Sequence, residues 1–226
     1  MPALRAAVFD LDGTLVDTLP DLHQALAALL REEGLVPPGR EEVRRMIGDG
    51  ARLLVLRALA RTGRTPGERE LQHWVDRYLA LYEARGHVDS RPLPGARATL
   101  EILKARGIKL GVCTNKPQAP SEALLEAVDL RCLFDAVLGG DRVARRKPDP
   151  AHLQALLTQI GVAPGEAVMI GDSRNDLEAA RGLGMPVVLL REGYGPDPRW
   201  ALRPDHWIAR LDELPALLAR LSDPPL

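Results

Sequence analysis

Two aspartates that follow a buried run of residues are the strongest chemical signal in this sequence. Asp10 and Asp12 come directly after the run Leu4 to Phe9, which is apolar apart from Arg5, and they open the stretch Asp10-Leu-Asp12-Gly-Thr14. The run predicts a strand, in which residues i and i+2 point to the same side, so the two carboxylates would project together. Because burying unpaired carboxylates is costly, the pair indicates a divalent cation or a reacting group.

Three further segments place polar side chains where a predicted strand ends or a predicted helix begins. They are Thr114-Asn115-Lys116, Lys147-Pro148 and Gly171-Asp172-Ser173-Arg174-Asn175-Asp176. In an open parallel sheet, ligands bind outside the carboxyl ends of the strands, where the strand-to-helix loops converge. Several carboxylates with a lysine and a hydroxyl at such a crevice indicate Mg²⁺ and a phosphate group.

The elements that must position these groups alternate between strand and helix along most of the chain. Besides Leu4–Phe9, apolar periodicity predicts strands over Ile108–Cys113, Ala136–Leu138, Ala167–Ile170 and Pro186–Leu190. It predicts helices over Pro94–Arg106, Ser121–Val128, Ala151–Ile160, Asn175–Gly182 and Asp212–Leu221. This alternation predicts an α/β fold with a Rossmann-like parallel sheet.

A block after the first strand lacks the alternation. Its apolar spacing predicts helices over Asp21–Glu33, Arg40–Ile47, Ala51–Arg61 and Glu68–Arg85, separated by glycines and prolines. We therefore expect a catalytic core made of residues 1–17 and 90–226. We expect residues 18–89 to form an all-helical cap domain beside the Asp10 loop.

Composition excludes several classes of partner. Thirty basic residues offset 31 acidic ones in 226 residues, so no basic field is available to attract nucleic acid or a membrane surface. No apolar run approaches the roughly 20 residues of a membrane span, and the N-terminus leads into a strand without a signal-peptide pattern. We expect a cytoplasmic monomer or homodimer that binds a small phosphate ester. The two cysteines, Cys113 and Cys132, indicate neither a disulfide framework nor a zinc site.

The ordered set of motifs resembles the haloacid dehalogenase (HAD) superfamily of phosphotransferases. The four motifs of that superfamily correspond here to Asp10-Leu-Asp12-Gly-Thr14, Thr114-Asn115, Lys147-Pro148 and Gly171-Asp172-Ser173-Arg174-Asn175-Asp176. The first and last motifs are specific, whereas the middle two carry weight only in this order. The resemblance implies a HAD-like core, with the helical block as a mobile lid.

The resemblance also implies a role for each motif residue. Asp10 would be the nucleophile that forms an aspartyl-phosphate, and Asp12 would protonate the leaving alcohol and then deprotonate a water. Thr114, the amide of Asn115 and Lys147 would contact the transferring phosphoryl group. The implied Mg²⁺ site consists of Asp10, the backbone carbonyl of Asp12, Asp172 and Asp176.

Asp12 separates this chain from the dehalogenases of the same superfamily. The resemblance implies that a dehalogenase lacks a second aspartate at this place, because displacement of halide needs no proton for the leaving group. The presence of Asp12 therefore favours phosphoryl transfer.

The cap sequence points to a substrate class. Four segments resemble those of bacterial phosphoglycolate phosphatases: Arg44–Leu54, Arg57–Leu59, Tyr82–Arg85 and Ser90–Gly95. This implies Mg²⁺-dependent hydrolysis of 2-phosphoglycolate to glycolate and phosphate. Gly48, Gly50 and Arg52 would then meet the substrate carboxylate. In an alternative interpretation, the two glycines only break two cap helices.

Other interpretations stay open at this point. Within the superfamily, the chain could act on pyrophosphate, a sugar phosphate or a nucleotide phosphate, whereas no cap acid suited to a phosphomutase is evident. In a different class, it could be a non-catalytic phosphate-binding regulatory module, although such a module has little need of Asp12. Trp74, Tyr78 and Tyr82 recur at helical spacing and are expected to pack within the cap or at a subunit contact.

Overall fold

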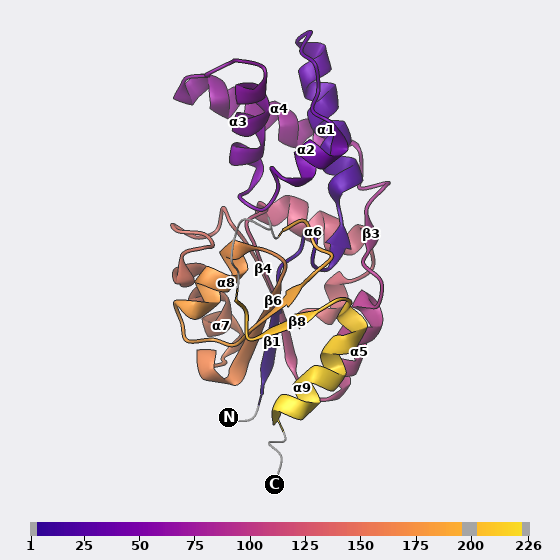
Figure 1. The fold of residues 1–226 in the computed structure, drawn as a ribbon, viewed down its shortest axis with the longest axis vertical. Coiled ribbons are helices and arrows are strands. Elements are labelled where there is room, and N and C mark those ends of the chain that lie inside the picture. Colours follow the sequence, from indigo (N-terminus) through magenta and orange to yellow (C-terminus); the bar gives the residue numbers. More distant parts are fainter. Residues whose placement is uncertain (1–3, 196–202, 223–226) are drawn as a thin grey trace.

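A parallel sheet of six strands forms the centre of the molecule in a computed structural model, which describes residues 4–195 and 203–222. Its strand order is β5-β4-β1-β6-β7-β8, and every neighbouring pair is parallel. The strands are β1 (Ala6–Phe9), β4 (Lys109–Thr114), β5 (Ala136–Gly139), β6 (Ala167–Gly171), β7 (Val187–Leu190) and β8 (His206–Ile208). This order confirms the predicted α/β, Rossmann-like fold (Figure 1).

The central strand, β1, is apolar throughout because both of its faces are covered by helices. All residues of β1 are fully buried, as expected for a parallel strand that is covered on both faces. Ala7 and Phe9 join one hydrophobic cluster, and Ala6 and Val8 join another, because successive side chains point to opposite faces. In the register of the sheet, Phe9 lies between Val112 of β4 and Ile170 of β6. The residues that follow these three positions therefore meet at one edge.

Helices cover both faces of the sheet. The cluster with Phe9 includes leucines of α5 (Ala96–Ala105), α6 (Gln118–Ala127) and α9 (Leu214–Ser222). The cluster with Val8 includes leucines of α7 (Pro150–Ile160) and α8 (Arg174–Arg181). The result is a three-layered α/β/α core (Figure 1).

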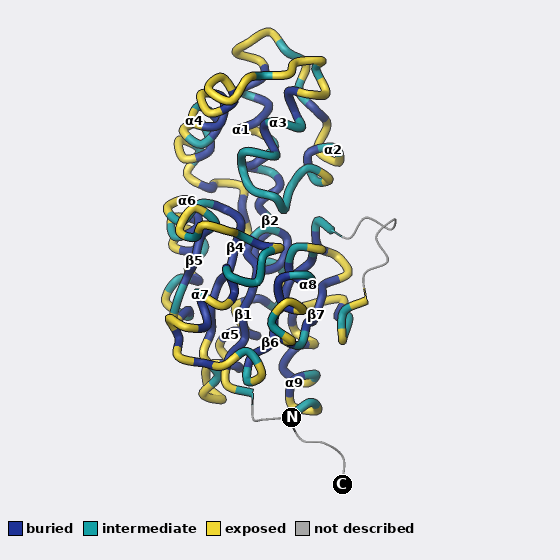
Figure 2. The backbone as a smooth tube through the Cα atoms, turned by 90° about the vertical axis from the view of Figure 1, so that its left-hand side faces the viewer, coloured by how far each residue is buried: buried dark blue, intermediate teal, exposed yellow. Residues whose placement is uncertain are grey.

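A separate group of helices lies beyond the carboxyl ends of the strands (Figure 1). It consists of α1 (Leu19–Glu32), α2 (Arg40–Arg44), α3 (Ala51–Arg61) and α4 (Glu68–Ala84). These helices share their own buried cluster, in which Leu26, Leu59 and Trp74 take part, so Trp74 packs as predicted. Figure 2 shows buried stretches of the chain in α1, α3 and α4. The chain enters the group through β2 (Val16–Asp17) and leaves it through β3 (Arg91–Pro92), which pair antiparallel.

Most differences between predicted and observed elements are shifts of one to three residues at the ends. The helix predicted over Arg40–Ile47 ends at Arg44 and continues only as turns, and the carbonyl of Met46 accepts a hydrogen bond from the Arg57 side chain. Sequence periodicity missed β2, β3 and β8, because these strands have two or three residues and no apolar run that could reveal them.

A buried carboxylate ties the start of the helical group to its exit. Asp21, on α1, is fully buried and accepts hydrogen bonds from the Ser90 hydroxyl at 2.7 Å and from the Arg85 guanidinium and the Asp89 amide at 3.1 Å. Burial alone would raise the pKa of Asp21, but the donors from Ser90, Arg85 and Asp89 hold it below the usual value. Asp21 therefore stabilises the joint between the two parts as a carboxylate.

We expect Asp21→Asn to lower the free energy of unfolding by roughly 2–4 kcal/mol, because an amide leaves donors facing donors at this joint. Since the folded pKa of Asp21 lies below its usual value of 3.8, the contribution is present above that pH and is lost as the pH falls through the folded pKa. Urea unfolding at several pH values measures it. The exposed Asp76→Asn is the control, and a change as small as the control's would contradict the assignment.

Candidate active site

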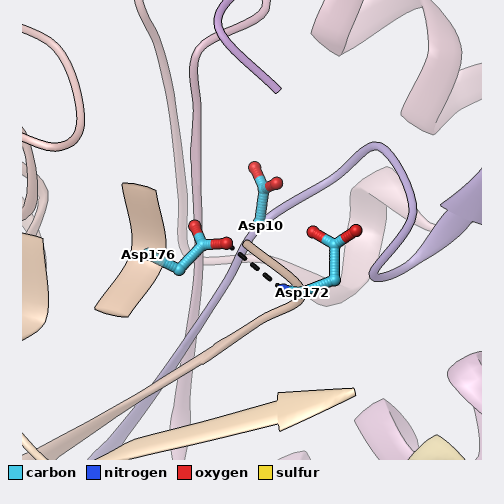
Figure 3. A group of neighbouring side chains, drawn as sticks. All are labelled: Asp10, Asp172 and Asp176. Carbon is cyan, nitrogen blue, oxygen red and sulfur yellow. Dashed lines mark hydrogen bonds between the residues drawn. The ribbon is translucent and has the colours of Figure 1, made fainter. Parts of the chain in front are cut away.

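Three carboxylates meet at the edge where the central strands end. Asp10 follows β1, Asp172 follows β6 and Asp176 lies in the first turn of α8. All three are buried, and carboxylate oxygens of the three lie within 4.8 Å of one another (Figure 3). The amide of Asp10 donates to the carbonyl of Ile170 at 2.9 Å, so the adjacent strands fix the spacing of Asp10 and Asp172. The structure thus brings together the carboxylates that the first and last motifs supply.

The turn after β1 needs its glycine for two reasons. Gly13 has a φ of +83°, which favours glycine, and a Cβ at this position would lie 2.7 Å from Oδ2 of Asp172. The tight turn also brings Thr14 close enough for its hydroxyl to donate to Oδ1 of Asp172 at 3.3 Å. Gly13 therefore allows the Asp10 loop to approach the Asp172 loop.

Lys147 bridges two of the carboxylates. Its Nζ lies 3.0 Å from Oδ1 of Asp10 and 2.6 Å from Oδ1 of Asp176, and its side chain is almost completely buried. The backbone amide of Lys147 donates to Nδ1 of His152 at 3.3 Å, while Nε2 of His152 donates to the carbonyl of Leu138 at 3.2 Å. Burial and the nearby lysine lower the pKa of His152 to about 4, so a neutral imidazole supports the lysine loop.

Asp176 supports the loop before it. Its Oδ2 accepts a hydrogen bond from the amide of Asp172 at 3.2 Å (Figure 3). The same oxygen accepts from the Ser173 amide at 3.0 Å and from the Ser173 hydroxyl at 2.6 Å. Its Oδ1 accepts from Lys147. A Cβ on Gly171 would lie 2.3 Å from Cγ of Asp176, which explains the glycine of this motif. Asp176 thus orients the loop that carries Asp172, and its carboxylate also belongs to the cluster that could hold a cation.

The charge of the cluster fits a divalent cation. Burial raises the pKa of Asp10 to about 6 against the lowering effect of Lys147, with Asp176 and Asp12 raising it further. Burial, followed by the charges of Asp10 and Asp176, raises the pKa of Asp172 well above its usual value. One ammonium faces three carboxylates, which leaves negative charge uncompensated. A hard cation that prefers oxygen ligands would remove this imbalance.

Two asparagines join the cap turn to the core. Nδ2 of Asn115, after β4, donates to the carbonyl of Gly48 at 3.0 Å and to that of Lys147 at 2.9 Å. Nδ2 of Asn175 donates to the same Gly48 carbonyl at 3.1 Å and to Oδ1 of Asp49 at 2.7 Å. The turn around Gly48 therefore lies directly on the motif residues rather than only separating two helices.

Gly50 is required by the same contact. It has a φ of +81°, and a Cβ there would lie 2.9 Å from the carbonyl oxygen of Asn115. Gly48 and Gly50 both line a cavity between the helical group and the core, so the structure places these two predicted residues beside Asp10. The sequence signal was the glycine spacing, but only the fold shows what it contacts.

Arg52 lies elsewhere. Its guanidinium contacts Oε1 of Glu68 at 2.6 Å and Oε1 of Gln72 at 3.3 Å, both on the exposed side of α4. It is not among the residues that line the cavity with Asp10. The structure therefore does not bring Arg52 to the predicted substrate site, because the Arg52 guanidinium pairs with Glu68 on α4 instead.

The cavity also contains residues that sequence reasoning had not assigned to the site. It is lined by Asp10, Asp12, Leu22, Ile47, Gly48, Gly50, Ala51, Leu54, Tyr78, Leu79, Tyr82, Thr114, Asn115, Lys116, Pro117 and Pro120. Tyr78 and Tyr82 were expected only to pack; they do pack, and they also line this cavity. Lys116, two residues after Thr114, also lines the cavity. The Thr114 hydroxyl accepts a hydrogen bond from the Lys116 amide at 3.2 Å.

Tyr194 connects the site to the joint between the two parts. Its amide donates to Oδ2 of Asp172 at 2.6 Å, and its hydroxyl donates to Oδ1 of Asp17 at 2.6 Å. The amides of Thr18 and Leu19 donate to the same hydroxyl at 2.6 and 2.8 Å. The sequence analysis did not identify Tyr194. Its one sequence signal is the glycine on each side of it, Gly193 and Gly195, shortly after β7. Oδ1 of Asp17 also accepts a hydrogen bond from the Leu19 amide at 3.3 Å, at the start of α1.

No helix in residues 4–195 and 203–222 is long and apolar enough to cross a membrane.

Comparisons with known proteins agree with this architecture. A phosphoglycolate phosphatase of Rhodospirillum rubrum is 46% identical over 198 residues, which cover 86% of this chain and 82% of the relative. One from Cereibacter sphaeroides (strain ATCC 17029) is 40% identical over 218 residues, with 96% and 99% covered. The crystal structure of a predicted phosphoglycolate phosphatase from Haemophilus somnus superposes with a TM-score of 0.87 at 31% identity, covering 96% of this chain and 99% of that one.

The family model with the description "haloacid dehalogenase-like hydrolase" matches residues 4–184, which include every motif of the site. On this match and these relatives, the chain belongs to the haloacid dehalogenase-like hydrolases.

Proposed function

We propose that this protein is a Mg²⁺-dependent phosphatase that hydrolyses 2-phosphoglycolate to glycolate and inorganic phosphate. The observation that carries the reaction type is the buried cluster of Asp10, Asp172 and Asp176, with Lys147 bound to it and Asp12 on the same cavity. The names of the relatives from Rhodospirillum and Cereibacter support the choice of substrate.

In this proposal, Asp10 is the nucleophile. Its carboxylate attacks phosphorus, the bond to the ester oxygen breaks, and Asp12 gives its proton to the departing alkoxide. Asp12 then takes a proton from a water that attacks the aspartyl-phosphate, which releases phosphate and restores Asp10. With a pKa near 6, Asp10 is largely ionised at neutral pH, as a nucleophile must be.

The metal site would consist of Asp10, Asp172 and the backbone carbonyl of Asp12. Asp176, assigned to the metal from sequence, would hold the Asp172 loop through the hydrogen bond between its Oδ2 and the Asp172 amide. When bound, Mg²⁺ would reduce the repulsion between the anionic nucleophile and the anionic phosphate.

The remaining motif residues would hold the phosphoryl group. The Thr114 hydroxyl and the amide of Asn115 stand at the end of β4, on the cavity that Asp10 also lines. Lys147 would stabilise negative charge that develops on the transferring oxygens while it keeps Asp10 in place.

We further propose that residues 18–89 act as a cap domain on a core of residues 1–17 and 90–226. The chain crosses between the parts only at β2 and β3 within the described residues, and a two-stranded connection suits a hinge. Closure through the Gly48 turn would exclude water from the phosphoryl group. We place the enzyme in the cytoplasm, as a monomer or homodimer.

The first prediction of this function concerns turnover. Phosphate release should be fastest with 2-phosphoglycolate in a panel with pyrophosphate, hexose phosphates and nucleoside monophosphates. It should stop with a chelator and fall roughly 10³-fold or more in Asp10→Asn. Mg²⁺-dependent turnover that favours another ester would keep the mechanism and discard the substrate. An absence of turnover on the whole panel would favour a phosphate-binding regulatory module.

A second prediction separates the two steps. Asp12→Asn should slow 2-phosphoglycolate hydrolysis by about 10²–10⁴-fold, because the leaving alkoxide lacks a proton donor. With p-nitrophenyl phosphate, whose leaving group needs no proton, the variant should release a burst of about one equivalent of nitrophenolate and then turn over slowly. Stopped-flow absorbance measures the burst. Asp10→Asn is the control without a burst, and a burst rate on p-nitrophenyl phosphate that falls as far as the rate on 2-phosphoglycolate would argue against Asp12 as the acid.

A third prediction concerns the metal-free protein. The raised pKa values of Asp10 and Asp172 mean that their contribution to stability is greatest below the unfolded value of 3.8 and declines as the pH rises through the folded values, about 6 for Asp10. Asp172→Asn should therefore raise the free energy of unfolding at neutral pH with a chelator by roughly 1–3 kcal/mol. The gain should shrink as the pH falls toward about 4.

Urea unfolding with a chelator at several pH values measures this gain. Thermal unfolding with and without Mg²⁺ tests whether Asp172 is a ligand of the metal. The wild type should gain stability with Mg²⁺ concentration, whereas Asp172→Asn should gain little, because ligand binding stabilises only a protein that retains the site. The exposed Asp76→Asn should respond to Mg²⁺ like the wild type. Equal stabilisation of wild type and Asp172→Asn would exclude Asp172 as a ligand.

A further inference from the structure

We propose that Lys116, together with the hydroxyls of Tyr78 and Tyr82, forms the site that binds the carboxylate of the substrate. This inference rests on the proposed function and names the residues that select an acid among phosphate esters. It replaces Arg52, whose guanidinium contacts α4 outside the cavity.

The charges along the cavity single out Lys116. Among the described residues that line the cavity, Lys116 is the one cation, and Asp10 and Asp12 are the anions. Its Nζ lies 3.2 Å from Oδ1 of Asp12, and its side chain is only 6% exposed. A substrate with a second negative charge therefore finds one positive partner in the cavity, and that partner is already desolvated.

The position of Lys116 matches the chemistry of the substrate. In 2-phosphoglycolate, one methylene separates the carboxylate from the ester oxygen that Asp12 would protonate. A group that contacts Asp12 directly is therefore at the right range for that carboxylate. Nζ of Lys116 also lies 4.3 Å from the centre of the Tyr82 ring, a cation–π contact that holds the ammonium at the cap end of the cavity.

The two tyrosine hydroxyls supply the second, independent observation. Tyr78 and Tyr82 are each 1% exposed, and neither hydroxyl has a hydrogen-bond partner. An unpaired buried hydroxyl costs about 1–3 kcal/mol, which a ligand oxygen in the cavity would recover. Burial raises the pKa of both phenols, so both remain donors at neutral pH. They are one helical turn apart on α4, with ring centres 6.3 Å apart, so both can serve one ligand.

Together these groups would bind the carboxylate, the part of the substrate that does not react. A carboxylate would receive an ionic hydrogen bond from Lys116 and neutral ones from Tyr78 and Tyr82. An ester of similar size with a hydroxyl in place of the carboxylate would leave the ammonium with Asp12 as its one anionic partner in the cavity. Tyr78 and Tyr82 of the cap and Lys116 of the core would thus select the acid, while the residues that hold the phosphoryl group treat every phosphate ester alike.

The decisive experiment compares two esters that differ only at this end: 2-phosphoglycolate and 2-hydroxyethyl phosphate. For Lys116→Met, kcat/KM on 2-phosphoglycolate should fall roughly 100-fold, at least tenfold more than on 2-hydroxyethyl phosphate. Lys116→Arg should recover part of the selectivity. Lys104→Met, on the exposed side of α5 and bonded to the carbonyls of Cys132 and Leu133, is the matched control and should leave the selectivity ratio as in the wild type.

The tyrosines are tested by removing single oxygen atoms. Tyr78→Phe and Tyr82→Phe keep both rings in the buried cluster, so the variants should fold and melt at or above the wild-type temperature. Each should raise KM for 2-phosphoglycolate about fivefold to tenfold with a smaller change in kcat. A purely structural role would leave the ratio between the two esters unchanged.

The outcomes distinguish a failure of this inference from a failure of the proposed phosphatase function. Suppose that the wild type prefers 2-phosphoglycolate but Lys116→Met lowers kcat/KM equally on both esters. Lys116 would then act through Asp12, which would refute the carboxylate site and leave the proposed function intact. Phenylalanine variants with wild-type selectivity would remove the tyrosines from the site. If the wild type does not prefer 2-phosphoglycolate over 2-hydroxyethyl phosphate, the proposed substrate and this site both fail.

Discussion

The buried ion pairs of Lys147 with Asp10 and Asp176 are the constraint on which the rest of the site depends. Three carboxylates crowd at the ends of two neighbouring strands, and a single ammonium compensates only part of their charge. Backbone amides and hydroxyls from the loops around them supply further hydrogen bonds, and glycines make room where the loops touch. The remaining imbalance is a structural reason for the chain to bind a cation.

The second constraint is the contact between cap and core. Asn115 and Asn175, which belong to the motif loops, both donate to the carbonyl of Gly48 on the cap. Asp21 and Tyr194 stabilise the crossing segments at the joint, and Tyr194 also reaches Asp172 through its amide. The groups that surround the phosphate site therefore also fix the position of the cap. The loops that carry the carboxylate motifs therefore also contact the cap, so the shape of the cavity depends on the same loops as the geometry of the carboxylates.

The core of the site could be predicted because its signals are local. Asp10 and Asp12 are two residues apart after an apolar run, and Asp172 and Asp176 follow another, so strand periodicity and the rule for parallel sheets place them at one edge. The alternation of elements gave the fold class for the same reason. Strands of two or three residues, such as β2 and β8, escaped prediction because their pairing comes from neighbouring strands rather than from their own sequence.

The sequence by itself determined the α/β core, the helical insertion and the reactive groups, because each depends on residue types at short spacing. Only the tertiary structure decided which cap residues face these groups. Tyr78 and Tyr82 have the spacing of ordinary packing residues, and Arg52 has the charge of a good anion ligand, yet the tyrosines line the cavity and Arg52 binds Glu68. Contacts between cap and core, such as those of Asn115 and Asn175 with the Gly48 carbonyl, join segments far apart in the chain. No local sequence pattern encodes such contacts.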